Sequence, residues 1–248
     1  MDSFTTDRYV RSHNRLFLLD YDGTLVNFKT NADHAIPTEQ LRSSLEQLAG
    51  DKENQVVIVS GRDRKSLDRM LGDLPISFVA EHGFFFKDLG GEWFSPIEKS
   101  TAWKHLVHRF MRSAAAGRPG VHIEEKVSSL VWHYDGAGSG AAEAATELRR
   151  KLLPEIKNLG LKAVPGRKIL EVRVADVNKG LAAKRWLDKD EWDFIFAAGD
   201  DTTDEDMFAA MPEAAISIKI GAGETVAKKR LETPTELNDL LTLLSKRA

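Results

Sequence analysis

Cysteine is absent from the 248 residues of this chain, which excludes disulfides, thiolate metal sites and cysteine nucleophiles. This absence fits a reducing compartment such as the cytoplasm. Long apolar runs are also lacking: none approaches the length of a membrane span, and residues 1–15 are polar, without the apolar stretch of a secretory signal. We therefore expect a cytoplasmic protein with no membrane partner.

An excess of charge of one sign is lacking too. The 35 Lys and Arg residues nearly balance the 38 Asp and Glu residues, giving a formal net charge of −3. Such a balance leaves no basic footprint for nucleic acid. It does not exclude an anionic small molecule, which a few local Lys and Arg residues can bind. The proportions of 42% hydrophobic and 29% charged residues are those of an ordinary globular protein.

Short apolar runs alternate with amphipathic stretches in the first third of the chain. Residues 16–20, 55–60 and 76–80 are typical of buried strands. Between them, residues 37–50 and 63–72 carry apolar side chains at helical spacing and end at glycine. Strands that alternate with helices predict a parallel α/β sheet.

The pattern changes to a mixed one between residues 84 and 172. A hairpin is expected around Asp88-Leu-Gly-Gly91, followed by short strands and two helices. The strand–helix alternation then resumes. We therefore predict an α/β fold with a Rossmann-like parallel-sheet core of residues 1–83 and 173–248 and an inserted α+β cap domain of residues 84–172. Near the C-terminus, we interpret residues 221–223 as a turn and residues 228–230 as a solvated helix face.

The hexapeptide Asp20-Tyr-Asp-Gly-Thr-Leu25 directly follows the first predicted strand. Two carboxylates so close together repel each other unless a cation or a proton lies between them. One carboxylate that attacks phosphorus and a second that moves a proton are sufficient for phosphoryl transfer through an aspartyl-phosphate. A polar turn without chemistry is the alternative, because Asp and Gly are common turn residues.

Three further features follow in sequence order, each at a predicted strand end or helix start. They are Ser60-Gly-Arg62, Lys179 and the pair Asp200-Asp201. Each alone could be a helix cap or a surface charge. Ligands in open parallel sheets, however, bind beyond the carboxyl ends of the strands, so the predicted fold gathers all of these residues in one crevice.

Together these residues meet the demands of phosphoryl transfer. The carboxylates of Asp20 and Asp200, with a main-chain carbonyl at Asp22, suit Mg²⁺. We expect Asp20 to attack phosphorus and Asp22 to move the proton. Ser60 can donate a hydrogen bond to a phosphate oxygen, and Lys179 can offset the negative charge.

These four features match, in order, the motifs of the haloacid dehalogenase-like phosphatase superfamily, which the chain resembles. The Asp at position 22 is the residue that phosphatases and mutases of that superfamily carry, whereas its ion-pumping ATPases carry Thr. A cap inserted after the third strand resembles that of sugar phosphatases and disfavours a mutase.

A narrower resemblance, to the trehalose-6-phosphate phosphatase family, covers nearly the whole chain. The segments that carry it are Leu19-Asp-Tyr-Asp-Gly-Thr-Leu25, Val59-Ser-Gly-Arg62, Ala80-Glu-His-Gly83, Glu124-Glu-Lys126, Trp132-His-Tyr134, Gly166-Arg-Lys-Ile-Leu-Glu-Val172, Asn178-Lys-Gly180 and Gly199-Asp-Asp-Thr-Thr-Asp-Glu205. The resemblance implies a Mg²⁺-dependent phosphatase that acts on trehalose 6-phosphate. It also implies a set of substrate-binding residues in the core and the cap: Arg62, His82, Gly83, Glu124, Lys126, Arg167 and Glu171.

Two alternatives stay open on the residues alone. The same chemistry could act on another glycosyl phosphate, or the chain could be a non-catalytic sugar-phosphate sensor. Retention of Asp20, Asp22 and Lys179 argues against a sensor. Proteins that fuse a synthase to such a phosphatase imply a functional link to a trehalose-6-phosphate synthase, and residues 9–15 resemble the linker that precedes the domain in those proteins.

Overall fold

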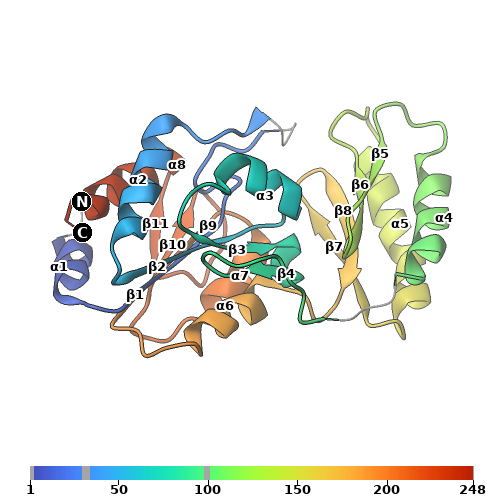
Figure 1. Cartoon of the computed structure of the whole chain (residues 1–248). Helices are drawn as coiled ribbons and strands as arrows, with labels where there is room; N and C mark the ends of the chain where they lie inside the picture. The colour runs from blue at the N-terminus through green and yellow to red at the C-terminus, as the bar shows by residue number, and fades with distance from the viewer. Residues whose placement is uncertain (1–2, 30–33, 98–100, 248) are drawn as a thin grey trace. The chain divides into compact units, whose positions relative to one another are not determined.

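The computed structural model of the chain describes residues 3–29, 34–97 and 101–247 (Figure 1). It divides into two compact units. Unit 1 comprises Met1–Pro96 and Asn178–Ala248, and unit 2 comprises Ile97–Val177. No helix among the described residues is both long and apolar enough to cross a membrane.

In the described part of unit 1, seven strands form one sheet in the order β11-β10-β9-β1-β2-β3-β4. All neighbours run parallel except β3 and β4, which are antiparallel. The mostly parallel α/β core expected from the sequence is therefore confirmed. The strands are β1 (Arg15–Leu19), β2 (Asn54–Val59), β3 (Ser77–Ala80), β4 (Phe85–Lys87), β9 (Phe194–Gly199), β10 (Ile216–Ile220) and β11 (Lys229–Leu231).

Helices cover both faces of this sheet: α2, α3 and α8 lie on one face, and α6 and α7 lie on the other (Figure 1). Side chains that accept a backbone N–H begin several of them, including Thr38 before α2 and Asp63 before α3. The helices of unit 1 are α1 (Ser3–Arg11), α2 (Glu39–Gly50), α3 (Arg64–Leu71), α6 (Lys179–Leu187), α7 (Thr202–Ala209) and α8 (Pro234–Ser245), with a 3₁₀ turn η2 (Glu81–Gly83).

The central strand β1 is buried along its whole length because both faces of the sheet are covered. Successive side chains of a strand point to opposite faces. Leu16 and Leu18 accordingly pack in a cluster with Trp186 of α6. Phe17, between them, meets the rings of Tyr9 and Phe194 on the other face. The β1 backbone is thereby fixed at the point where it delivers the residues that follow it.

The boundaries of the two units differ from the expected 83/84 and 172/173. β4 joins the sheet of unit 1 by antiparallel pairing with β3, and Phe86 forms a bridge to Phe94. Residues 84–96 therefore belong to unit 1, and unit 2 ends at Val177. Residues 1–2, 30–33, 98–100 and 248 of the expected domains lie outside the described residues.

One local interpretation in unit 1 needs correction, and one helix was not predicted. Residues 229 and 230, expected together with residue 228 on a helix face, lie in the edge strand β11, which pairs with β10 through Ile218↔Lys229. A strand of three residues is too short to show an alternation of apolar and polar side chains, so the sequence did not predict it. The N-terminal residues also form α1, which the polar composition did not predict.

Four antiparallel strands form the sheet of the described part of unit 2, in the order β5-β6-β8-β7. Two helices cover one of its faces (Figure 1). The buried Trp132 lies on that face and donates its indole N–H to the carbonyl of Met111 in α4. The elements are α4 (Trp103–Ala115), β5 (His122–Glu125), β6 (Ser129–His133), α5 (Ala141–Ile156), β7 (Leu161–Gly166) and β8 (Ile169–Val174).

Candidate active site

The centre of the site is Asp20, the first residue after β1. It is 4% exposed, and its strand lies between β9 and β2. One carboxylate oxygen accepts a hydrogen bond from Lys179 Nζ at 2.5 Å, and the other accepts from the Thr24 hydroxyl at 2.8 Å. Lys179 is the first residue of α6, which Asn178 caps. Asp20 and Lys179, which are 159 residues apart in sequence, thus meet directly.

Asp204 of α7 completes this buried cluster. Its Oδ1 accepts from Lys179 Nζ at 2.7 Å. Its Oδ2 accepts from the backbone N–H groups of Asp200 at 3.1 Å and Asp201 at 3.0 Å. Sequence reasoning assigned no role to Asp204, although it lies within the quoted segment and one helical turn after Asp200. That spacing is the signal that could have found it.

The acidic cluster is electrostatically crowded. Burial, reinforced by Asp204, raises the pKa of the Asp20 carboxyl well above its usual range, although Lys179 opposes the shift. Burial and Asp204 also raise the pKa of Asp200 to about 6. Burial disfavours the charge on Lys179, but Asp20 and Asp204 outweigh burial and raise the pKa of its ammonium group. The cluster as a whole favours an added positive charge.

The carboxylates fit a hard divalent cation. One oxygen each of Asp20, Asp200 and Asp204 lies within 4.8 Å of the others. Oxygen ligands in such an arrangement are those that Mg²⁺ takes, usually through one or two carboxylates together with waters and phosphate. Asp204 accepts from two backbone N–H groups as well as from Lys179, so Asp20 and Asp200 are the members best suited to hold the ion.

Gly23 lets these carboxylates come together. Its φ is 84°, a left-handed conformation that glycine adopts without strain. A Cβ at this position would lie 2.0 Å from Oδ2 of Asp200. The turn after β1 can therefore reach the end of β9 only with glycine at this position.

Asp22 lies outside this cluster. Its carboxylate forms two hydrogen bonds of 2.6 Å with the guanidinium of Arg62, which also lies over the ring of Tyr21. A planar pair of this kind is among the stronger charge-assisted contacts. The pairing leaves only the main chain of Asp22 for a metal, which is the contribution expected from the sequence, and directs its carboxylate toward Arg62.

Ser60 and His82 lie in two loops that contact each other. Ser60 follows β2, is 1% exposed, and its Oγ accepts from the backbone N–H of Arg62 at 3.1 Å. The backbone N–H of His82 donates to the Ser60 carbonyl at 3.0 Å. A Cβ on Gly61 would lie 2.6 Å from the imidazole of His82. Ser60, Arg62 and His82, all predicted from the sequence, therefore form one packed group.

The turn η2 carries unusual backbone angles. Glu81 and His82 have φ values of 48° and 59°, and Gly83 has a φ of 113°. Positive φ in consecutive non-glycine residues costs free energy and is found mainly at functional sites. A Cβ on Gly83 would lie 3.0 Å from that of Ala182 in α6. Glycine at position 83 therefore lets the turn lie directly against the helix that begins with Lys179.

In unit 2, two predicted carboxylates share one face of the sheet. Glu124 of β5 and Glu171 of β8 both pair with Val131 of β6. Residues paired in this way point to the same side, and the adjacent Trp132 points to the helices. Glu124 and Glu171 therefore lie on the face that α4 and α5 leave uncovered.

Basic groups accompany Glu124 on that face. His133 lies 2.8 Å from its carboxylate, and Lys126 Nζ lies 3.9 Å away. Burial opposes ionisation of Glu124, but His133 and Lys126 outweigh it and lower the pKa of the carboxyl. Arg167 lies apart, exposed in the turn between β7 and β8, where Lys168 has a φ of 61°. The predicted unit 2 residues thus fall into a sheet-face group and one exposed turn residue.

The architecture of the chain is that of a known class of hydrolases. It resembles a haloacid dehalogenase-like hydrolase from Bacteroides thetaiotaomicron with a TM-score of 0.69 at 13% identity, over 93% of this chain and 99% of that one. The fold, with acidic residues at the carboxyl ends of β1 and β9, is therefore haloacid dehalogenase-like.

Within that class, the sequence model of the trehalose-phosphatase family matches residues 18–238, so the chain belongs to this family of phosphoric monoester hydrolases. It is 42% identical, over 97% of its length, to a bifunctional trehalose-6-phosphate synthase/phosphatase of Thermoproteus tenax, and 34% identical to a trehalose-phosphatase of Saccharomyces cerevisiae over 96%. The C-terminal domain of the trehalose-6-phosphate phosphatase of C. albicans matches with a TM-score of 0.92 at 30% identity, over 99% of this chain and 97% of that one.

The chain spans about a third of the length of these two curated relatives, 33% of the Thermoproteus protein and 32% of the yeast protein.

Proposed function

We propose that this chain is a Mg²⁺-dependent phosphatase that hydrolyses trehalose 6-phosphate to trehalose and inorganic phosphate in trehalose biosynthesis. The observation that carries the proposal is the buried contact of 2.5 Å between Asp20 and Lys179 inside the acidic cluster. A carboxylate beside an ammonium group can approach an anionic phosphate that a lone carboxylate would repel. Membership of the trehalose-phosphatase family supports the sugar phosphate as substrate.

The reaction divides into two displacements at phosphorus. A carboxylate oxygen of Asp20 forms a bond to phosphorus while the bond from phosphorus to the sugar oxygen breaks, and Asp22 gives that oxygen a proton. Water then attacks the aspartyl-phosphate, Asp22 takes its proton, and the bond between phosphorus and Asp20 breaks. Ser60 and Lys179 donate to the phosphoryl oxygens throughout.

Asp20 and Asp200, with the main chain of Asp22, are the groups that would hold Mg²⁺. When bound, the ion acts as a Lewis acid that offsets the charge on phosphate. The raised pKa values of Asp20 and Asp200 support a cation at this position, because a bound cation would stabilise the ionised form of both carboxylates.

Unit 2 is proposed to act as the cap that recognises the sugar. A disaccharide presents hydroxyl groups that can form hydrogen bonds with charged side chains. Such side chains discriminate between sugars, because a ligand that lacks the matching hydroxyl leaves them unpaired at a cost in free energy. Glu124, Lys126 and Glu171 on the sheet face opposite α4 and α5 fit this task, and Arg167 is a fourth candidate. In unit 1, Arg62, His82 and Gly83 form the proposed substrate-binding group around Ser60.

The relatives that join a synthase and a phosphatase in one chain support a functional link to a trehalose-6-phosphate synthase. The lack of cysteine supports action in the cytoplasm.

The test measures phosphate release from trehalose 6-phosphate, glucose 6-phosphate and sucrose 6-phosphate, with Mg²⁺ and with EDTA. We expect metal-dependent turnover confined to trehalose 6-phosphate, and none from Asp20→Asn. Turnover of another sugar phosphate would keep the chemistry and overturn the substrate. Tight binding without turnover would point instead to a sensor.

A further inference from the structure

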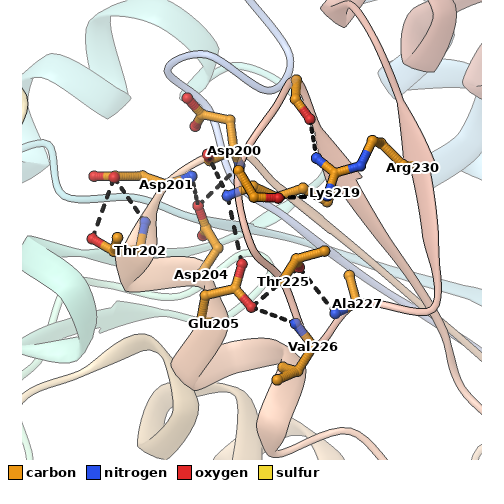
Figure 2. Close-up of polar contacts among 12 residues, drawn as sticks. Asp200, Asp201, Thr202, Asp204, Glu205, Lys219, Thr225, Val226, Ala227 and Arg230 are labelled. Carbon is orange, nitrogen blue, oxygen red and sulfur yellow. Dashed lines mark hydrogen bonds and ion pairs between the residues drawn. The ribbon is translucent and has the colours of Figure 1, made fainter.

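Lys219 is a buried lysine outside the residues assigned so far. It lies on β10, is 4% exposed, and its register partner on β9 is Gly199, directly before Asp200. Its ammonium group donates to the main-chain carbonyl of Asp200 at 2.6 Å (Figure 2). Lysine is seldom buried so completely, because its charge loses hydration. A buried charge at this position therefore calls for a specific partner, and the carbonyl of Asp200 is one.

Glu205 of α7 is the second partner of Lys219. One of its oxygens lies 3.5 Å from Lys219 Nζ. The other accepts from the hydroxyl of Thr225 at 3.1 Å and from the backbone N–H of Val226 at 2.8 Å. Figure 2 shows Lys219 between Asp200 and Glu205, with the segment of Thr225 and Val226 on the far side of Glu205. One chain of contacts thus joins β10, the end of β9, α7 and the segment after β10.

Asp200 is in this way restrained through three different groups. Lys219 binds its carbonyl, Asp204 accepts from its N–H at 3.1 Å, and Thr24 donates to its carboxylate at 3.3 Å. Without such restraints, the mutual repulsion of the carboxylates of Asp20, Asp200 and Asp204 would push Asp200 out of the cluster. The contact from Lys219 is the only one of the three that comes from a charged donor.

We propose that Lys219 is a positioning residue: it holds the main chain of Asp200 so that the carboxylate stays in place to bind the divalent cation. The inference rests on the proposed function in one respect, that Asp200 holds the metal. Groups that orient a ligand in this way typically matter about 10- to 100-fold in metal affinity.

A purely electrostatic effect of Lys219 would have the opposite sign. Removing a positive charge near a cluster of carboxylates strengthens the attraction of that cluster for a cation. Removing a positioning contact weakens cation binding, because the ligand must be ordered when the ion arrives. The direction of the change in Mg²⁺ affinity therefore separates the two explanations.

The experiment compares the unchanged protein with Lys219→Met, which keeps the apolar stem of the side chain. Calorimetric titration with Mg²⁺ should give a dissociation constant raised about 10-fold in the variant. In the metal-free proteins, amide hydrogen exchange of residues 199–202 should be faster in the variant. At saturating Mg²⁺, kcat should return close to that of the unchanged protein, because Lys219 does not touch the reacting atoms.

Lys228→Met is the matched control. Lys228 also donates to main-chain carbonyls, but it is exposed and its partners, Glu213 and Ala215, lie outside the acidic cluster. It should change neither the Mg²⁺ affinity nor exchange at residues 199–202. Unchanged or tighter Mg²⁺ binding in Lys219→Met, with unchanged exchange, would overturn the proposal.

Two further outcomes are covered. If Lys219→Met does not fold, Lys219→Gln replaces it. The glutamine side chain is shorter than that of lysine and is neutral, so the two explanations again predict opposite changes in Mg²⁺ affinity. If the unchanged protein binds no Mg²⁺, the proposed metal dependence itself fails. Hydrogen exchange in the metal-free protein then decides alone whether Lys219 restrains Asp200.

Discussion

At the scale of single residues, the crowding of carboxylates makes a prediction about pH. The pKa of Asp200 is raised from 3.8 to about 6 by burial and by Asp204. The metal-free folded protein therefore binds more protons than the unfolded chain between these pH values. Titration of Asp200 should therefore lower the free energy of unfolding as pH rises from about 4 to 6, and the free energy should stay lower at higher pH.

Asp200→Asn removes this titration and keeps the shape of the side chain. In EDTA, we expect the variant to be more stable than the unchanged protein at pH 7, by about 3 kcal/mol at most, and equally stable near pH 4. Urea unfolding at both pH values measures the difference. A variant that is less stable than the unchanged protein at pH 7 would show that the ionised carboxylate of Asp200 does not destabilise the metal-free fold. Added Mg²⁺ should stabilise the unchanged protein alone.

Single residues also show where sequence reasoning stops. Asp20 and Lys179 were identified from their motifs, and they meet in the structure. Lys219 carries no comparable signal, and Asp204 carries only its spacing from Asp200, because a carboxylate in a first helical turn and a lysine in a strand are ordinary by themselves. Their importance comes from burial and from partners that only the folded chain brings near.

At the scale of elements, strands and helices with a strong period were predictable, and an edge strand was not. Buried strands such as β1 and β2 are short apolar runs that the sequence displays openly. β11 is three residues long and gains its place by pairing with β10. The strand β4 was expected as one arm of the hairpin around residues 88–91, but its pairing with β3 was not. Because β4 pairs with β3, residues 84–96 belong to unit 1, and the boundary between the units lies later in the chain than expected.

The contact between the loop after β2 and the turn η2 yields a second prediction. In Gly61→Ala, the added methyl would lie 2.6 Å from the imidazole of His82, whose backbone is already in a positive-φ conformation. We expect a loss of about 1–3 kcal/mol in the free energy of unfolding, as for an overpacked core, together with reduced phosphate release.

Gly50→Ala is the control for this change. Gly50 ends α2, and a Cβ there would meet nothing within 4 Å. It should not lower the denaturation midpoint, because alanine favours the helix over glycine, and it should leave the activity unchanged. Equal behaviour of the two variants would show that Gly61 and His82 do not constrain each other.

At the scale of the whole molecule, the predicted residues separate into two groups that the two units carry. Asp20, Lys179 and Asp200 belong to unit 1, and Glu124 and Glu171 belong to unit 2. The order of motifs along the chain predicted this division, since the inserted segment interrupts the strand–helix alternation. The register that sets Glu124 and Glu171 on one face was not predictable, because it depends on the pairing of both strands with β6.

This division predicts that a change in unit 2 affects recognition of the sugar and leaves the chemistry intact. For Glu124→Gln we expect KM for trehalose 6-phosphate to rise about 10-fold, as for the loss of one charged hydrogen bond. Hydrolysis of p-nitrophenyl phosphate, which has no sugar, should be unchanged. Glu147→Gln is the control in the same unit: Glu147 is partly exposed on α5 and pairs with Arg150, and both substrates should be turned over as before. If Glu124→Gln slowed both substrates alike, Glu124 would act on the chemistry or the fold, and the proposed division of work between the units would be wrong.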